Sequence, residues 1–287
     1  MFYLLITSFI WAFSFGLIKG DLTNLDPSLV SLIRLFISLI MFLPFLKFNK
    51  IKKISAPLLI VGAVQFGLMY IAYIYSFKFL KAHEVALFTI FTPIYVTLFN
   101  DLARKKGLNF TSLISAVLAI IGAGTIMYSK LGDGNFVNGI LLAQCSSICF
   151  ASGQLYYKKL MGENKDVGNV DVFAILYAGA VAITLLSTFF SGGFRDIAII
   201  TMQQLWVLLY LGIISSGIGF FLWNIGVVKS KVSTLAVMND VKIPIAVLCS
   251  IIFFGETADW TKFIVGGGIM LAAVIISEKN SGGESIS

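Results

Sequence analysis

Charged residues are scarce in this 287-residue chain, and their scarcity excludes a water-soluble domain. Only 12% of the residues are charged, whereas 58% are hydrophobic and the mean hydropathy is +0.94. A soluble domain of average composition carries about 25% charged residues. Too few polar side chains are present to cover a water-facing surface, so the sequence predicts a protein whose solvent is the lipid bilayer.

Cysteine and histidine are also rare, and this excludes two further architectures. The cysteines, Cys145, Cys149 and Cys249, lie within apolar stretches, where we expect small packing residues rather than a disulfide framework. A single histidine makes a structural zinc site implausible. We therefore expect neither a metal nor a cofactor.

The sequence also lacks the motifs of enzymes and of nucleic-acid-binding proteins. It contains no Gly-Lys-Ser/Thr phosphate loop and no nucleophile elbow, so neither ATP hydrolysis nor an enzymatic site is predicted. The net charge of +7 comes from basic residues in short loops between apolar segments. Such loops indicate membrane topology rather than a nucleic-acid partner.

What the chain does contain is a series of apolar segments of about 20 residues, the length that crosses a bilayer as a helix. In lipid each segment must satisfy its own backbone hydrogen bonds, so we predict an all-α integral membrane protein. The first segment lacks a basic leader and a small-residue cleavage site, and we expect it to be retained. Ten spans are predicted, at residues 2–20, 28–46, 56–79, 83–101, 110–129, 138–159, 170–190, 203–227, 232–254 and 262–278.

The distribution of lysine and arginine predicts the orientation of these helices. With the N-terminus inside, thirteen basic residues fall in cytoplasmic connections and six in external ones. Cytoplasmic loops carry the excess of Lys and Arg. We therefore expect a multi-pass protein of the inner cell membrane with both termini in the cytoplasm.

The two halves of the sequence repeat each other. A shift of 151 positions pairs Pro93 with Pro244, among other identities, and a shift of 138 pairs Ser14 with Ser152. Repeated blocks of apolar helices are typical of secondary transporters, in which the substrate site lies between the repeats.

An odd number of helices in each half predicts that the repeats are inverted. Five helices return the chain to the opposite side of the membrane, so the second half enters from the other face. The predicted units are residues 1–130 and 131–287, each a five-helix repeat.

Several short motifs resemble a known family. The first span reads Ile-Trp-Ala-Phe-Ser-Phe-Gly at 10–16, the eighth reads Gly-Phe-Phe-Leu-Trp-Asn at 219–224, and the ninth carries Pro244 and ends at Gly255-Glu256. This series resembles the ten-helix EamA-type branch of the drug/metabolite transporter superfamily over essentially the whole chain. The resemblance implies two five-helix bundles around a central cavity, alternating access, and export or exchange of amino acids, amines or related metabolites.

Two charged residues, Asp240 and Lys242, lie near the middle of the predicted span 232–254, beside Asn239. A charge at such depth is costly and usually faces a cavity or a partner. We expect Asp240 to bind a substrate ammonium or to exchange a proton, and Lys242 to bind a carboxylate. An inter-helix ion pair or hydrogen-bond network is the alternative for both.

Three further charged or titratable residues are candidates for a functional role. His83 and Glu84 open the fourth span, where they could form a gate or accept protons; alternatively, Glu84 stabilises the helix N-terminus. Arg34 lies two turns into the second span. We expect its side chain to snorkel or to pair with a carboxylate such as Asp26.

Amphipathic side chains complete the predicted site. Trp11, Tyr70 and Tyr73 suit the walls of a metabolite site, although helix packing explains them equally well. Tyr73 corresponds to Asn224 under the shift of 151, which makes both candidates for substrate binding. Gln154 is a further candidate of the same kind.

The sequence as a whole predicts a secondary transporter that moves an amino acid or related amine by alternating access. The substrate gradient or protons would supply the energy, with Asp240 or His83 as proton carrier. One alternative is an exchanger of a nucleotide-derived cofactor or another anionic metabolite, which Lys242 and Arg34 would clamp. The second alternative is a non-transporting receptor or scaffold.

Overall fold

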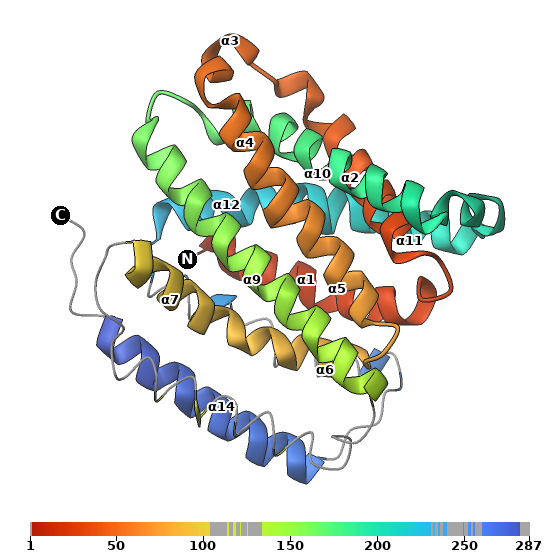
Figure 1. The fold of residues 1–287 in the computed structure, drawn as a ribbon, viewed down its shortest axis with the longest axis vertical. Coiled ribbons are helices and arrows are strands. Elements are labelled where there is room, and N and C mark those ends of the chain that lie inside the picture. Colours follow the sequence, from red (N-terminus) through yellow and green to blue (C-terminus); the bar gives the residue numbers. More distant parts are fainter. Residues whose placement is uncertain are drawn as a thin grey trace.

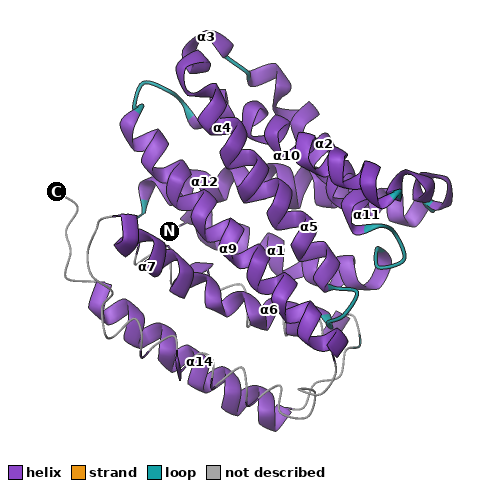
Figure 2. Ribbon diagram, in the orientation of Figure 1, coloured by secondary structure: helices purple, strands orange, loops and turns teal. Residues whose placement is uncertain are grey.

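The computed structural model describes residues 2–103, 134–230 and 260–281, with single positions between 114 and 125 and between 232 and 255. This part of the chain is helical and contains no strand (Figure 2). The α-helices are α1 (Phe2–Asp21), α2 (Pro27–Phe42), α3 (Phe48–Ile51), α4 (Ser55–Gly62), α5 (Met69–Ser76), α6 (Ala82–Phe88), α7 (Thr92–Ala103), α9 (Gly134–Glu163), α10 (Asn169–Ser191), α11 (Met202–Tyr210), α12 (Gly219–Lys229) and α14 (Trp260–Ser281).

Short segments of other helix types join several of these elements. Four are 3-10 turns, namely η1 (Leu43–Phe45), η2 (Lys52–Ile54), η4 (Thr89–Phe91) and η5 (Gly193–Ile199). Two are π-helical, namely η3 (Ala63–Leu68) and η6 (Leu211–Ile218). Each π segment continues the α-helices on either side of it, so α4–η3–α5 and α11–η6–α12 are two long, locally widened helices (Figure 1).

Seven helices of the described residues are long and apolar enough to cross a membrane. They match seven of the predicted spans, and α14 covers the predicted span 262–278. Most positions of the predicted spans 110–129 and 232–254 lie outside the described residues. The seven are Phe2–Asp21, Pro27–Phe45, Phe48–Ser76, Ala82–Ala103, Asn135–Glu163, Asn169–Ser191 and Met202–Lys229.

The π segment η6 has carbonyl groups that neighbouring helices satisfy. A π turn breaks the α-helical hydrogen-bond ladder, and in lipid every freed carbonyl needs a donor. Trp11 Nε1 donates to Ser215 O at 3.1 Å, and Tyr177 OH donates to Ser216 O at 2.6 Å. Side chains of α1 and α10 therefore hold η6 in place.

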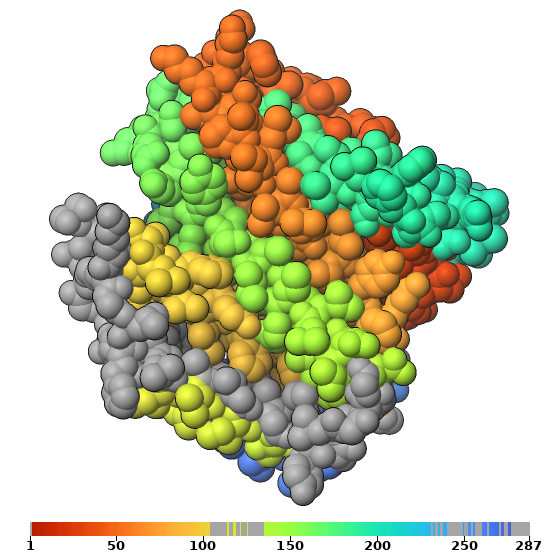
Figure 3. Space-filling model, in the orientation of Figure 1, coloured from red at the N-terminus to blue at the C-terminus, as the bar shows by residue number. Residues whose placement is uncertain are grey.

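Glycine lets the backbones of α4 and α10 touch. A Cβ atom at Gly62 would overlap the carbonyl oxygen of Leu176, and one at Gly179 would overlap that of Leu59. Small residues at such crossings are the usual means of close helix packing in membranes. On the face shown in Figure 3, α4 and α5 lie between α9 and α10. The crossing fixes the helix that carries Tyr70 against the second half of the chain.

Candidate functional site

A cavity of about 60 Å³ lies within the bundle, where α1, α2, α5, η4, α7, α9, η6 and α12 come together. Metabolite sites are usually larger, roughly 300–1,000 Å³, so cargo of that size requires the helices to move apart. Arg34 is the one charged side chain among its described lining residues. They are Trp11, Ser14, Phe15, Arg34, Met69, Tyr70, Tyr73, Thr89, Thr92, Ser146, Ser147, Phe150, Ser215 and Phe220.

The Arg34 guanidinium is buried and held by hydroxyl groups. Its side chain is 1% exposed. Nη2 donates to Tyr70 OH at 2.8 Å, and Nε donates to Ser216 Oγ at 3.2 Å. The guanidinium carbon also lies 4.3 Å from the centre of the Tyr70 ring, within cation–π distance. The head group is therefore fixed in orientation by neutral partners.

No described carboxylate neutralises this cation. Nη1 of Arg34 is buried and has no hydrogen-bond partner among the described residues. The predicted pairing with Asp26 is wrong, because Asp26 caps the N-terminus of α2. Its Oδ1 accepts from the backbone N–H groups of Ser28 at 2.9 Å and Leu29 at 3.1 Å. Among the described residues the positive charge of Arg34 therefore has no acidic partner, and two of its five donor N–H groups belong to Nη1.

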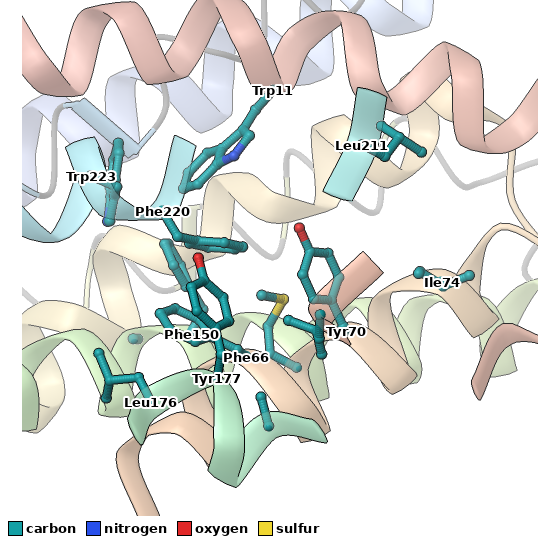
Figure 4. Close-up of a cluster of buried hydrophobic side chains, with 14 of the residues drawn as sticks. Trp11, Phe66, Tyr70, Ile74, Phe150, Leu176, Tyr177, Leu211, Phe220 and Trp223 are labelled. Atoms are coloured by element: carbon teal, nitrogen blue, oxygen red, sulfur yellow. The ribbon is translucent and has the colours of Figure 1, made fainter. Parts of the chain in front are cut away.

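An aromatic layer closes one end of the cavity. The Trp11 ring lies 4.9 Å from Phe220 and 5.0 Å from Trp223, centre to centre. Phe150 lies 5.8 Å from both tryptophan rings. Figure 4 shows these rings grouped together, with Tyr70 to one side of them. The cavity is thus a mostly apolar space with one cationic end.

Of the predicted substrate-binding residues, Trp11, Tyr70 and Tyr73 line this cavity. Gln154 and Asn224 are fully buried but lie beyond the aromatic layer, where Gln154 Oε1 accepts from Trp223 Nε1 at 3.0 Å. Asn224 Oδ1 accepts from Gln65 Nε2 at 2.9 Å.

The remaining candidates give fewer structural clues. Asn239 is buried, and its Nδ2 donates to Leu235 O of its own segment at 2.8 Å. Asp240 and Lys242 lie outside the described residues. His83 and Glu84 are buried at the start of α6, where Glu84 Oε2 accepts from Lys81 N at 2.9 Å. Glu84 therefore caps the helix, the role expected from its alternative reading.

Sequence reasoning missed Ser215, Ser216 and Gln65, which make the key polar contacts. The repeat offered a signal for two of them, because Gln65 and Ser216 correspond under the shift of 151. Both lie in π segments, and residues 63–68 correspond to 214–219, which overlap η6. Paired polar residues within two repeat-related apolar spans mark positions that face the interior.

Comparison with known proteins identifies relatives over the whole chain. The model of the EamA-like transporter family matches twice, at residues 1–128 and 137–278. The biotin transporter of Escherichia coli K12 is 36% identical over 279 residues, which cover 96% of this chain and 92% of that protein. The probable biotin transporter of Pseudomonas aeruginosa is 32% identical, covering 96% and 97% respectively.

A solved crystal structure has the same fold. It superposes with a TM-score of 0.64 over 98% of this chain and 97% of its own chain, at 14% sequence identity. The described helices are therefore arranged as in an experimentally determined protein of the same size class.

Proposed function

The chain belongs to the EamA-like transporter family of the drug/metabolite transporter superfamily, and on this premise we propose that it carries a small monocarboxylate across the cell membrane, with biotin or a close analogue as cargo. It is a multi-pass membrane transporter, as its relatives are, and not an enzyme. The proposal concerns the cargo, the residues that bind it, and the way in which the helices move.

The observation that carries the proposal is the buried guanidinium of Arg34, which no described carboxylate neutralises. A fixed guanidinium attracts a carboxylate, and the charge-assisted hydrogen bond between the two groups is stronger in a dry environment. Arg34 Nη1 has no partner within the described part of the chain, while Nη2 donates to Tyr70 and Nε donates to Ser216. A carboxylate in the cavity would neutralise the cation that the described residues leave unpaired.

An amino acid fits this cavity less well than the sequence alone suggests. Its ammonium group needs an acidic or strongly accepting partner beside the carboxylate site. The described lining residues offer hydroxyl groups and aromatic rings but no acid. The relatives named above are called transporters of biotin, a carboxylate without an ammonium group. Both points favour the anionic alternative over an amino acid or amine.

Uptake into proteoliposomes tests the proposed cargo. The purified chain should give saturable uptake of labelled biotin, and excess unlabelled desthiobiotin should compete with it. Alanine and lysine at the same concentrations should not compete. Saturable uptake of an amino acid, with no response to either carboxylate, would contradict the proposal.

We further propose that two inverted repeats, 1–130 and 131–287, rock about this cavity, with both termini in the cytoplasm. The family model matches each half separately. The helix pairings support a pseudo-two-fold relation, because α4 and η3 pack on α10 whereas η6 packs on α2. Exchanging the halves converts one pairing into the other. Proton coupling through His83 or Asp240 remains part of the proposal.

Two lysines cap repeat-equivalent helix ends on opposite faces of the bundle. Lys19 Nζ donates to Phe77 O at 2.7 Å, beyond the end of α5. Lys158 Nζ donates at the end of α12 to Ser230 O at 2.7 Å, Val227 O at 2.8 Å and Val228 O at 3.1 Å. Phe77 and Val228 correspond under the shift of 151. The two faces are opposite because α1 runs antiparallel to α12, with Leu4 against Gly226. In the proposed mechanism each lysine stabilises the closed position of the helix end that it contacts, on a different side of the membrane.

Removing one lysine should open one side of the cavity only. We expect Lys19→Met and Lys158→Met each to increase labelling of a cysteine at Ser146 about tenfold, since one charged hydrogen bond contributes roughly 1.5–3 kcal/mol. The measurement uses a membrane-impermeant thiol reagent applied to either face of vesicles, in a background without the native cysteines. The cysteine should become more reactive from one face of the membrane in the first variant and from the opposite face in the second. Increased labelling from the same face in both would contradict the assignment.

A further inference from the structure

Beyond the aromatic layer lies a second polar cluster, formed by three buried amide side chains. Gln65 comes from η3, Gln154 from α9 and Asn224 from α12, and each is fully buried. Gln65 Nε2 donates to Asn224 Oδ1 at 2.9 Å. Trp223 Nε1 donates to Gln154 Oε1 at 3.0 Å. Gln154 follows Gly153, at which a Cβ atom would overlap the Gln65 side chain, so α9 places Gln154 close to the Gln65–Asn224 pair.

Each of these amides has one polar atom that no described residue satisfies. The three atoms are Gln65 Oε1, Gln154 Nε2 and Asn224 Nδ2. Exchanging the oxygen and nitrogen positions in both the Gln65 and Asn224 amides does not change this result. In either assignment one amide oxygen and one NH₂ group have no partner among the described residues. Buried polar atoms are nearly always paired, so three free ones in one cluster point to a ligand.

The cluster adjoins the cavity through a layer one ring thick. Trp223, which bonds Gln154, lies 5.0 Å from Trp11 and 5.8 Å from Phe150, and both of those rings line the cavity. A rotation of Trp223 would join the two spaces. On the shared helix, Gln65 precedes Tyr70 by five residues, which separates the two polar ends by roughly 7 Å along the axis.

The Arg34 site and the amide cluster contain residues at equivalent positions of the two sequence repeats. Ser216 holds Arg34, and Gln65, its equivalent under the shift of 151, holds Asn224. Each π segment therefore contributes one polar residue to one polar site, and the aromatic layer lies between the sites. This arrangement suits an elongated cargo with two polar ends and an apolar middle.

Resting on the function proposed above, we infer that Gln65, Gln154 and Asn224 form a second subsite, which binds a neutral head group that both donates and accepts hydrogen bonds. Free NH₂ groups complement a carbonyl oxygen, and the free amide oxygen complements an N–H. A cyclic urea or a cyclic amide offers this pair of functions, whereas a simple fatty acid offers neither. The cargo places its carboxylate on Arg34 and its head group on the amides.

Competition against labelled biotin uptake in proteoliposomes tests the subsite with two probes. Desthiobiotin carries a cyclic urea and a carboxylate, whereas hexanoate carries the carboxylate alone. The wild-type chain should prefer desthiobiotin by about 30-fold or more, the effect of two hydrogen bonds. Asn224→Leu should reduce this preference to a few-fold and leave inhibition by hexanoate unchanged. Gln154→Met, on a different helix, provides the same test should Asn224→Leu not fold.

The outcomes separate this inference from the proposed function. If neither probe competes in the wild-type chain, the carboxylate cargo itself is wrong. If both probes compete and the amide variants weaken them equally, or change neither, the amides serve packing and the subsite is wrong. A selective loss of desthiobiotin binding supports the subsite, because a packing defect would not distinguish the two probes.

Discussion

Replacing Arg34 by methionine is expected to abolish saturable carboxylate transport without unfolding the protein. The methionine variant loses the hydrogen bond from Nη1 to the carboxylate, worth roughly 1.5–3 kcal/mol, and also the Coulomb attraction of the buried cation. Losing both should lower kcat/KM for biotin by at least about 100-fold. Initial rates of uptake in proteoliposomes, at matched protein reconstitution, provide the measurement.

The expected effect of the same change on stability has the opposite sign. Arg34 is buried, and no described carboxylate offsets the free-energy cost of removing its charge from water. An apolar residue of similar length should leave thermal unfolding in detergent unchanged or raise its midpoint, as often happens when a functional charge is removed. A variant that loses both transport and stability would instead assign Arg34 to packing.

Lysine at the same position provides the matched control. Arg34→Lys keeps the positive charge but loses the planar fork and the stacking on Tyr70. We expect an intermediate loss, about tenfold, with KM affected more than kcat because ground-state binding of the carboxylate is weakened. Equal activity of the lysine and methionine variants would show that charge at this position does not bind the cargo.

The structure explains which parts of the site the sequence predicted. Hydropathy alone predicted seven spans that the described residues confirm, because lipid dictates helix length. The ring-bearing residues Trp11, Tyr70 and Tyr73 were predicted because few side chains suit both an apolar wall and a polar cargo. All three line the cavity, and their binding of the cargo stays a prediction.

The role of Arg34 could not be derived in the same way. Its nearest carboxylate in sequence, Asp26, was a natural partner, but the cap at the start of α2 engages that side chain. Two of its actual partners, Ser215 and Ser216, lie about 180 positions away along the chain. They face Arg34 because α2 packs on the π segment η6, and a π turn in an apolar run leaves no simple hydropathy signal.

The glycine crossing between α4 and α10 should be the point of the fold most sensitive to a single methyl group. Gly62→Ala places a Cβ atom against the carbonyl oxygen of Leu176, and backbone cannot rotate away as a side chain can. Overpacking of this kind costs about 1–3 kcal/mol or more. For a chain of this size we expect the thermal midpoint to fall by roughly 5–10 °C in detergent.

Gly162→Ala provides the matched control for this substitution. Gly162 lies near the end of α9 with no atom within 4 Å of its would-be Cβ. Alanine is the better helix former by about 1 kcal/mol, so this variant should be neutral or slightly stabilising. A similar loss in both variants would trace the effect to glycine content and not to the crossing.

A double substitution tests whether the two helices share one contact surface. Gly179→Ala meets the carbonyl oxygen of Leu59 from the facing helix. Once one methyl group has forced α4 and α10 apart, the second should meet less resistance, so the double variant should lose less stability than the two single losses added together. Because η3 and α5 continue from α4, the displacement also moves Tyr70 relative to Arg34. Carboxylate uptake should therefore fall together with stability, in contrast to the Arg34→Met variant, where uptake is lost alone.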